Sequence, residues 1–585
     1  MVIKVIFLVI FFAMMIAVGL YSRRHASNVN DFVLGGRSVG PWLTAFAYGT
    51  SYFSAVVFVG YAGQFGYKYG LASTWIGIGN ALIGSLLAWV ILGRRTRIMS
   101  NHLSAATMPD YFGKRYQSNA LRIAASVISF VFLIPYTASV YNGLSRLFGM
   151  AFDIPYEACV MVMAALTCVY VILGGYMATA INDFIQGLIM LGGIAAVIAA
   201  VLNGQGGFLD AVRSLSEFES DAAVTLGQKG AFTSFFGPDP LNLLGVIVLT
   251  SLGTWGLPQM IHKFYAIKDE KSIQSGTIIS TFFAIVVSGG CYFLGGFGRL
   301  FDTPAIYKED GGIIYDAIIP SMLSTLPDLL VGIVIVLVLS ASMSTLSSLV
   351  LTSSSTLTLD FLKDNIIKKM SDKMQLLCMR ILLVFFIACS VVLALFPPKS
   401  MAQFIAQLMG ISWGALAGAF LAPFLYGLYW KGVTRAAVWA SFACGVGITV
   451  SNLFLSYIAS PINAGALAML AGLVLVPAVS LVTPRMEKQD VEHIFACLEE
   501  QVVVDKKIAL PKAAGHSVTS SLEFVFFLTH YCDILKFDPA CDILSVERYS
   551  KETVSKSQML SFAYRAHRQT LYIRETTDWE IRWEA

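Results

Sequence analysis

Long apolar segments recur along most of the chain, and they restrict its fold more than any other feature of the sequence. A hydrocarbon core about 30 Å thick is crossed by a helix of about 20 apolar residues. Segments this long and uniform indicate helices, because transmembrane strands give short alternating patterns. We therefore predict an all-α integral membrane protein with about thirteen transmembrane helices. The segments cover residues 3–22, 41–65, 74–93, 120–149, 157–178, 181–202, 239–259, 277–299, 328–352, 377–397, 402–428, 435–458 and 463–483.

The composition agrees with a chain that lies mostly in lipid. Of 585 residues, 56% are hydrophobic and only 13% are charged, which is too little charge for a water-soluble protein of this length. The formal net charge of +4 gives no reason to expect a nucleic-acid partner. An enzyme within the membrane would need clusters of His, Asp or Glu in its spans, but the chain has only seven histidines, and four of them follow residue 486. We therefore expect the lipid bilayer as a partner, no nucleic acid, and no enzymatic activity.

Basic residues are distributed unevenly over the loops, and this predicts the orientation. The loops that follow odd-numbered segments carry seventeen Lys and Arg residues, whereas the other loops carry six. Cytoplasmic loops are the ones enriched in Lys and Arg. We expect a multi-pass protein of the plasma (inner) membrane, with the N-terminus outside and the C-terminus in the cytoplasm. The polar residues 486–585 then form a cytoplasmic tail, in which the apolar stretch 520–535 is too short to span and is expected to be helical.

Two apolar segments contain helix-breaking residues in their middle. The clusters are Gly49, Thr50, Ser51 and Ser54 in the second segment and Gly253, Gly256 and Pro258 in the seventh. Backbone carbonyls freed at such breaks can bind a ligand. Each broken segment opens a group of five, and an odd number per group inverts the second group relative to the first. Broken helices in matching places of two inverted halves indicate the central site of a secondary transporter, although Gly is also common where membrane helices simply pack closely.

This grouping divides the chain into five parts. A first helix precedes the two repeats, and two further helices and the tail follow them. The predicted parts are residues 1–40 (first helix and inner loop), 41–202 (first repeat), 203–434 (second repeat), 435–485 (two further helices) and 486–585 (tail).

A stripe of hydroxyl side chains in the ninth segment indicates what binds beside the breaks. Ser344 lies four residues after Ser340 and three before Ser347, so these side chains share one helix face. Thr345 and Ser348 lie next to them. Neutral oxygen ligands suit a monovalent hard cation. The alternative is a Ser/Thr seam between helices, worth about 1 kcal/mol per hydrogen bond.

Asp183 is the ionisable residue that the sequence singles out, between the fifth and sixth segments. A carboxylate at the inner mouth would attract a cation that leaves a central site. The alternative is that Asn182 or Asp183 caps the sixth helix. His262 and Lys263, after the seventh segment, are interpreted as anchors at the inner membrane face.

Six stretches between about residue 30 and residue 440 form a recognisable pattern. They are GGRSVGPWLTAFAYGTSYFSA, ATMPDYFGKRY, VILGGYMATAINDFIQG, WGLPQMIHKFYAIKDEKS, LSASMSTLSS and APFLYGLYWKGVT. In these stretches the chain resembles the sodium:solute symporter family, which includes carriers of proline, pantothenate, sialic acid and sugars. The resemblance implies a core of two inverted five-helix repeats like that of the leucine transporter, extra helices around it, and Na⁺ as the co-transported ion.

The resemblance also implies site residues. Sodium would be bound by the backbone carbonyls of Thr50, Phe53 and Ala341 and by the hydroxyls of Ser344 and Thr345, with Asp183 near its inward exit. A small-molecule solute would lie beside the ion, and the candidate residues for it are Ser54, Trp255, Gln407 and Tyr136. Residues typical of the proline carriers are replaced at Tyr52, Ala55 and Thr254, and those typical of the sugar carriers at Val57 and Ser251. Few polar side chains remain at this pocket, which favours a small organic acid or an amino-acid-like solute.

We therefore predict a sodium-coupled symporter that imports such a solute by alternating access. Sodium would hold the ninth helix against the broken second helix and complete the solute site. A tenfold coupling between the two ligands corresponds to about 1.4 kcal/mol. The alternative is a transporter-like membrane receptor or sensor with a cytoplasmic interaction tail, although that tail lacks the glycine-rich nucleotide motif of a kinase.

Overall fold

The computed structural model describes residues 2–22, 28–152, 154–308, 311–363, 365–396, 405–498, 543–548, 570–574 and 579–583. The chain divides into two compact units, Met1–Met486 and Glu487–Ala585. The helices of the first unit are α1 (Val2–Ser22), α2 (Val29–Leu34), α3 (Pro41–Tyr52), α4 (Ala62–Tyr69), α5 (Thr74–Gly79), α6 (Arg94–His102), α7 (Met108–Arg115), α8 (Asn119–Phe152), α9 (Tyr156–Gly204), α10 (Phe208–Ser216), α11 (Pro240–Leu252), α12 (Pro258–Ala266), α13 (Glu270–Ala284), α14 (Gly290–Gly295), α15 (Ile318–Ser324), α16 (Asp328–Thr356), α17 (Asp372–Leu395), α18 (Ile405–Tyr429), α19 (Arg435–Leu455) and α20 (Pro461–Val482).

The second unit contains one short helix and a small sheet. Helix α21 covers Lys488–Phe495. The strands are β1 (Ile543–Arg548), β2 (Thr570–Arg574) and β3 (Trp579–Trp583), in the order β2-β1-β3. Strand β1 pairs with β2 in parallel and with β3 in antiparallel orientation. The all-α prediction therefore applies to the first unit and does not extend to these strands, and the helix expected at 520–535 lies outside the described residues.

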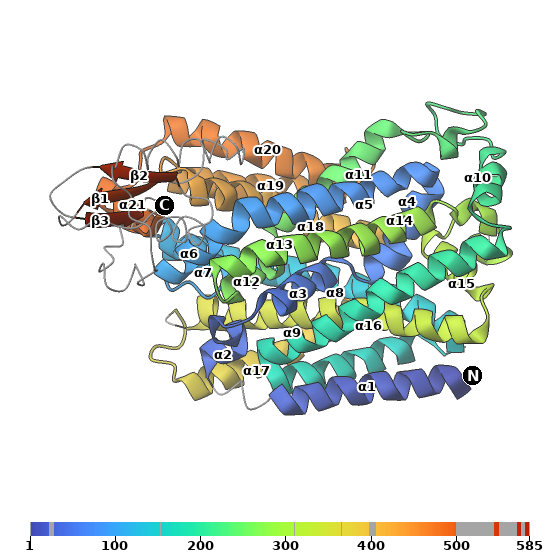
Figure 1. Ribbon diagram of the computed structural model, residues 1–585, viewed down its shortest axis with the longest axis horizontal. Coiled ribbons are helices and arrows are strands. Elements are labelled where there is room, and N and C mark those ends of the chain that lie inside the picture. The colour runs from blue at the N-terminus through green and yellow to red at the C-terminus, as the bar shows by residue number, and fades with distance from the viewer. Residues whose placement is uncertain are drawn as a thin grey trace, which may run out of the picture. The chain divides into compact units, whose positions relative to one another are not determined.

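Among the described residues, ten helices are long and apolar enough to cross a membrane, or eleven if the bent pair α11–α12 is one span. A multi-pass helical protein is thus confirmed, whereas the count of thirteen stays a prediction. The difference arises because one helical stretch, Val56–His102, includes parts of the segments 41–65 and 74–93, and because the apolar helix Tyr156–Val169 is shorter than a full span. Helix α9 contains both 157–178 and 181–202, and Gly175 (φ 55°, ψ −151°) separates its two parts. In Figure 1 the long helices of this unit run side by side, with the start of α1 and α10 at one end and α2, α6 and α7 at the other.

The first break lies between α3 and α4. Helix α3 ends at Tyr52, Phe53 has extended backbone angles (φ −106°, ψ 95°), and a π-helical turn over Val56–Tyr61 leads into α4. The segment is therefore broken as predicted, at Phe53 and Ser54, whereas Gly49, Thr50 and Ser51 stay helical. Gly49 serves packing instead, because a Cβ there would lie 2.4 Å from the ring of Phe283 on α13.

The second break separates α11 from α12. Helix α11 ends at Leu252, a 3₁₀ turn covers Gly253–Gly256, and Leu257 has extended angles (φ −87°, ψ 121°). Pro258 is the first residue of α12, where its fixed φ is compatible with a helix and its missing N–H has no intrahelical partner to lose. The two halves are bent by 46°, so the predicted break is present.

The two breaks lie close to each other in space. The Tyr52 hydroxyl, at the end of α3, donates a hydrogen bond of 2.5 Å to the carbonyl of Thr250, in the last turn of α11. Helix α18 packs against both breaks. A Cβ on Gly60 would lie 2.8 Å from Ile405, and one on Gly253 would lie 2.7 Å from the ring of Trp413. Glycine at these positions lets α18 approach both breaks.

Glycine contacts also supply a stability prediction. A Cβ on Gly66 in α4 would lie 2.0 Å from the backbone of Gly295 in α14, so Gly66→Ala forces the two helices apart. We expect a loss of about 1–3 kcal/mol in unfolding free energy, the usual range for overpacking. Gly192→Ala is the control: no atom lies within 4 Å of its added Cβ, so it should be neutral or stabilising. Melting temperatures of the purified variants check this, and equal values for the two would contradict it.

Candidate functional site

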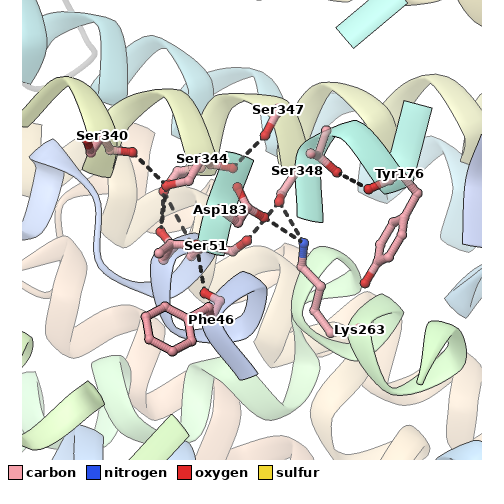
Figure 2. A network of polar contacts seen from close by, with 12 residues as sticks. Phe46, Ser51, Tyr176, Asp183, Lys263, Ser340, Ser344, Ser347 and Ser348 are labelled. Atoms are coloured by element: carbon pink, nitrogen blue, oxygen red, sulfur yellow. Dashed lines mark hydrogen bonds and ion pairs between the residues drawn. The ribbon is translucent and has the colours of Figure 1, made fainter. Parts of the chain in front are cut away.

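A cluster of oxygen atoms lies where α16 packs against the end of α3. Oγ of Ser344 is 3.1 Å from the carbonyl oxygen of Thr50, and Oγ1 of Thr345 is 3.2 Å from the same atom. Both hydroxyl oxygens also lie 3.1 Å from the carbonyl oxygen of Ala341. All four residues are buried. Figure 2 shows Ser344 on its helix next to the helix end that carries Ser51 and Phe46.

These four oxygens can rearrange to hold a cation. Ser344 can donate to the Ser340 carbonyl at 2.9 Å and Thr345 to the Ala341 carbonyl at 3.1 Å, so each hydrogen can point along α16 while the oxygen lone pairs face Thr50. Oxygen ligands of Ca²⁺, whose radius is close to that of Na⁺, lie at about 2.4 Å, so two ligands at right angles are about 3.4 Å apart. The observed separations of 3.1 Å and 3.2 Å are slightly shorter. A small expansion of the cluster would therefore admit sodium.

Phe53, the fifth expected ligand, lies at the break itself. Its N–H donates to the carbonyl of Gly49 at 3.1 Å, which completes the last turn of α3. Within the described part of the chain no backbone N–H donates to the carbonyl of Phe53, because Val57 and Phe58 both donate to Ser54. The break thus leaves this carbonyl available as a ligand.

A second polar network adjoins the first and reaches α9 and α12 (Figure 2). The ammonium of Lys263 donates to Oγ of Ser348 at 2.9 Å and lies 3.7 Å from Oδ2 of Asp183. Oγ of Ser348 lies 2.7 Å from Oγ of Ser51, the residue after Thr50. Lys263 is 2% exposed and Asp183 is 0% exposed. The network around the buried ion pair therefore includes residues of α3 and α16, the two helices that also form the oxygen cluster.

The positions of Lys263 and Asp183 correct two interpretations made from the sequence. Lys263 and His262 are buried, so they are not anchors at the membrane face. Asp183 lies inside α9, well past the interruption at Gly175, so neither it nor Asn182 caps a helix. Lys263 was misplaced because the seventh segment was taken to end before it, whereas Pro258 begins a new helix within the span. The role of Asp183 at the inward exit stays a prediction.

The four candidate solute residues are not all brought together. Ser54 and Tyr136 are buried, and the Tyr136 hydroxyl lies close enough to interact with Ser54 and with Trp413. Trp255 donates its Nε1–H to the carbonyl of Ile83 at 3.0 Å, so this N–H is already used. Gln407 is half-buried near the start of α18, and no described contact joins it to the other three.

Three buried side chains near the breaks were not assigned to the site from the sequence. Trp413 on α18 packs edge-on against Tyr136, with ring centroids 5.9 Å apart. Tyr52 stacks on Phe53 at 4.2 Å. Neither Trp413 Nε1 nor the Tyr136 hydroxyl has a hydrogen-bond partner among the described residues. Lys263 is the third; a lysine in the second turn after a proline start was the available signal.

Comparisons with known proteins agree with this geometry. The sodium:solute symporter family matches residues 32–445. Sodium/proline symporters of Staphylococcus aureus strains JH9 and NCTC 8325 are 31% identical over 460 residues, which cover 76% of this chain and 85% of theirs. A solved structure described as the substrate-bound outward-open state of a Na⁺-coupled sialic acid symporter covers 83% of this chain and 98% of its own, with 15% identity and a TM-score of 0.67.

The structural similarity shows that the chain shares its fold with that protein. The family match and the relatives confirm the sequence-based assignment. The protein is a sodium-coupled solute transporter and not an enzyme, and Na⁺ is its co-transported ion. The chain belongs to the sodium:solute symporter family.

Proposed function

We propose that this symporter imports a small organic acid or an amino-acid-like solute, driven by one sodium-binding site at the meeting of α3 and α16. The observation that carries the site is the convergence of the Ser344 and Thr345 hydroxyls on the Thr50 carbonyl. Ala341 and Phe53 supply the remaining carbonyl ligands. The class of solute is supported by the relatives described as sodium/proline symporters, since proline is an amino acid.

The site couples ion and solute because both use the same break. Ser54, a candidate solute residue, follows Phe53 directly, so an ion held by the Phe53 carbonyl fixes the backbone that positions Ser54. Tyr136 then lies across from Ser54. Each ligand stabilises the break for the other, and this reciprocity is the requirement for coupled transport. Rocking of one helix group against the other opens the inner path, with Asp183 beside it.

The proposed orientation places the N-terminus outside the plasma (inner) membrane and residues 486–585 in the cytoplasm. The uneven loop charge supports it. The two repeats are proposed at 41–202 and 203–434, each opened by one of the two broken helices. Cysteine labelling from outside the cell at residues 205 and 101 tests the orientation, since only the first should react.

Uptake into proteoliposomes tests the proposed function directly. The purified chain is reconstituted, and radiolabelled proline, short monocarboxylates, pantothenate, sialic acid and glucose are offered with an inward sodium gradient or with potassium. We expect sodium-dependent accumulation of one of the acidic or amino-acid-like compounds. Accumulation of glucose alone, or uptake that ignores sodium, would contradict the proposal.

Tyr136→Phe tests the solute site. Because the Tyr136 hydroxyl makes no hydrogen bond within the described residues, its removal should not lower stability. A lost hydrogen bond to the solute costs about 0.5–1.5 kcal/mol, so we expect KM for the solute to rise up to about tenfold. Tyr141→Phe on the same helix is the control, because that hydroxyl is also buried and unpartnered in the described part but is not a proposed solute contact. A KM that rises equally in both variants would exclude Tyr136 as a solute ligand.

A further inference from the structure

A positively charged side chain lies buried next to the proposed sodium site, and no step of the proposed transport uses it. Lys263 belongs to α12, the second half of a broken membrane helix. Its side chain is 2% exposed, and its ammonium reaches between α9 and α16 (Figure 2). Burying an ammonium is costly unless other groups compensate it, so the position needs a physical reason.

The ion pair with Asp183 is not built as a tight structural salt bridge. Charge-assisted hydrogen bonds between ammonium and carboxylate usually measure about 2.7–2.9 Å, whereas Nζ of Lys263 lies 3.7 Å from Oδ2 of Asp183. Neither oxygen of Asp183 has a hydrogen-bond partner among the described residues. The carboxylate is fully buried and yet incompletely satisfied, which is unusual for a pair that only stabilises a fold.

The groups around the ammonium are ligands that a hard metal cation would also accept. They are the carboxylate of Asp183 and the hydroxyl oxygen of Ser348, and the hydroxyl oxygen of Ser51 lies 2.7 Å from that of Ser348. Carboxylate and hydroxyl oxygens favour alkali and alkaline-earth cations. A lysine ammonium is a compact point charge with three donors, so it can occupy a position of this kind.

This position is connected to the proposed sodium site through neighbouring residues. Ser51 follows Thr50, whose carbonyl is a proposed sodium ligand, and Oγ1 of Thr345 lies 3.5 Å from the carbonyl oxygen of Ser51. Ser348 lies one turn beyond Thr345 on α16. A mobile ion leaving the Thr50–Ser344 cluster toward Asp183 therefore meets the ammonium of Lys263.

We propose that Lys263 is a tethered cation that fills a second cation-binding position formed by Asp183, Ser348 and Ser51, and so limits the symporter to one sodium ion. This inference rests on the proposed sodium site. With the ammonium in place, Asp183 is neutralised and no mobile cation is held there. Without it, the carboxylate and the two hydroxyls form a vacant site for a second sodium ion.

Equilibrium binding of ²²Na⁺ to the purified full-length chain tests this without knowledge of the solute. We expect one ion per chain in the wild type and two in Lys263→Met, with the Hill coefficient rising from about 1 toward 2. Lys263→Arg keeps a positive charge and should bind one ion. The double variant Lys263→Met/Asp183→Asn removes both charges and should also return to one ion.

Thermal stability supplies an independent readout. Sodium that binds only the folded chain raises its melting temperature, so Lys263→Met should respond to sodium more steeply than the wild type or the double variant. Two bound ions in the wild type, or one in folded Lys263→Met, would overturn the inference. If Lys263→Met cannot be purified as a folded protein with or without sodium, the number of sodium ions bound by the wild type decides. Two bound ions overturn the inference. One bound ion in both the wild type and Lys263→Arg supports it. If the wild type binds no sodium, the proposed function fails together with the inference. If the wild type binds two ions, the inference about Lys263 fails while the proposed function stands.

Discussion

Replacing Ser344 and Thr345 together by alanine is expected to abolish sodium-stimulated uptake. The double variant removes two of the five proposed ligands and leaves the Thr50 carbonyl without the hydroxyls that meet it at 3.1 Å and 3.2 Å. A contact to a charged partner contributes about 1.5–3 kcal/mol. Loss of two such contacts should weaken sodium binding by about 10²–10⁴-fold. Sodium dependence of uptake and ²²Na⁺ binding measure this effect.

Ser342→Ala is the matched control for this double variant. Ser342 lies on the same helix and is equally buried, but its hydroxyl donates to the Val338 carbonyl at 2.7 Å, within α16 itself. Its removal deletes a buried hydroxyl without touching the oxygen cluster, so the sodium affinity should stay near that of the wild type. An equal loss of sodium affinity in Ser342→Ala would show that any change to α16 weakens binding. Unchanged sodium dependence in the double variant would mean that the sodium site does not lie on α16.

Local rules predicted the hydroxyl stripe and the breaks, whereas the set of sodium ligands was expected from the family resemblance and stays a prediction. Ser340, Ser344 and Ser347 share a helix face by their spacing, and breaks leave carbonyls free. Phe53 is extended, as a broken helix requires. The contact between Thr50 and α16 joins residues almost three hundred positions apart, and it was expected from the family resemblance and not from spacing.

The number of helices and the ion pair between Lys263 and Asp183 were harder to predict from the sequence. Hydropathy shows where apolar segments lie but not how helices break and join, and the stretch Val56–His102 includes parts of two predicted segments. Lys263 was assigned to a loop because a charge normally marks the end of a span. Its partner Asp183 lies on another helix, and pairing between distant positions leaves no local pattern. The same holds for Trp413, whose proximity to Tyr136 depends on how α18 packs.

The second large effect is expected from Asp183→Asn. This change removes the carboxylate 3.7 Å from the Lys263 ammonium and leaves a buried cation with Ser348 as its hydrogen-bond partner. Breaking a buried pair by removing one partner usually costs about 3–5 kcal/mol, because the remaining charge is uncompensated. We expect a clearly lowered melting temperature at fixed sodium concentration, together with reduced uptake.

Adding Lys263→Met to Asp183→Asn should recover much of the lost stability, since replacing both charges removes the uncompensated ammonium. Asp210→Asn is the control, because Asp210 and Arg213 form an ion pair that is largely exposed, and its loss should change the melting temperature little. The double variant could instead be less stable than Asp183→Asn alone. Lys263 would then stabilise the fold independently of Asp183, through its hydrogen bond to Ser348 and its contact with Tyr176, whose ring centroid lies 5.3 Å from the ammonium. Recovery of stability without recovery of uptake would instead separate two proposed roles of Asp183. Compensation of the Lys263 charge depends on charge balance alone, whereas the proposed guidance of sodium out of the site would require the carboxylate itself.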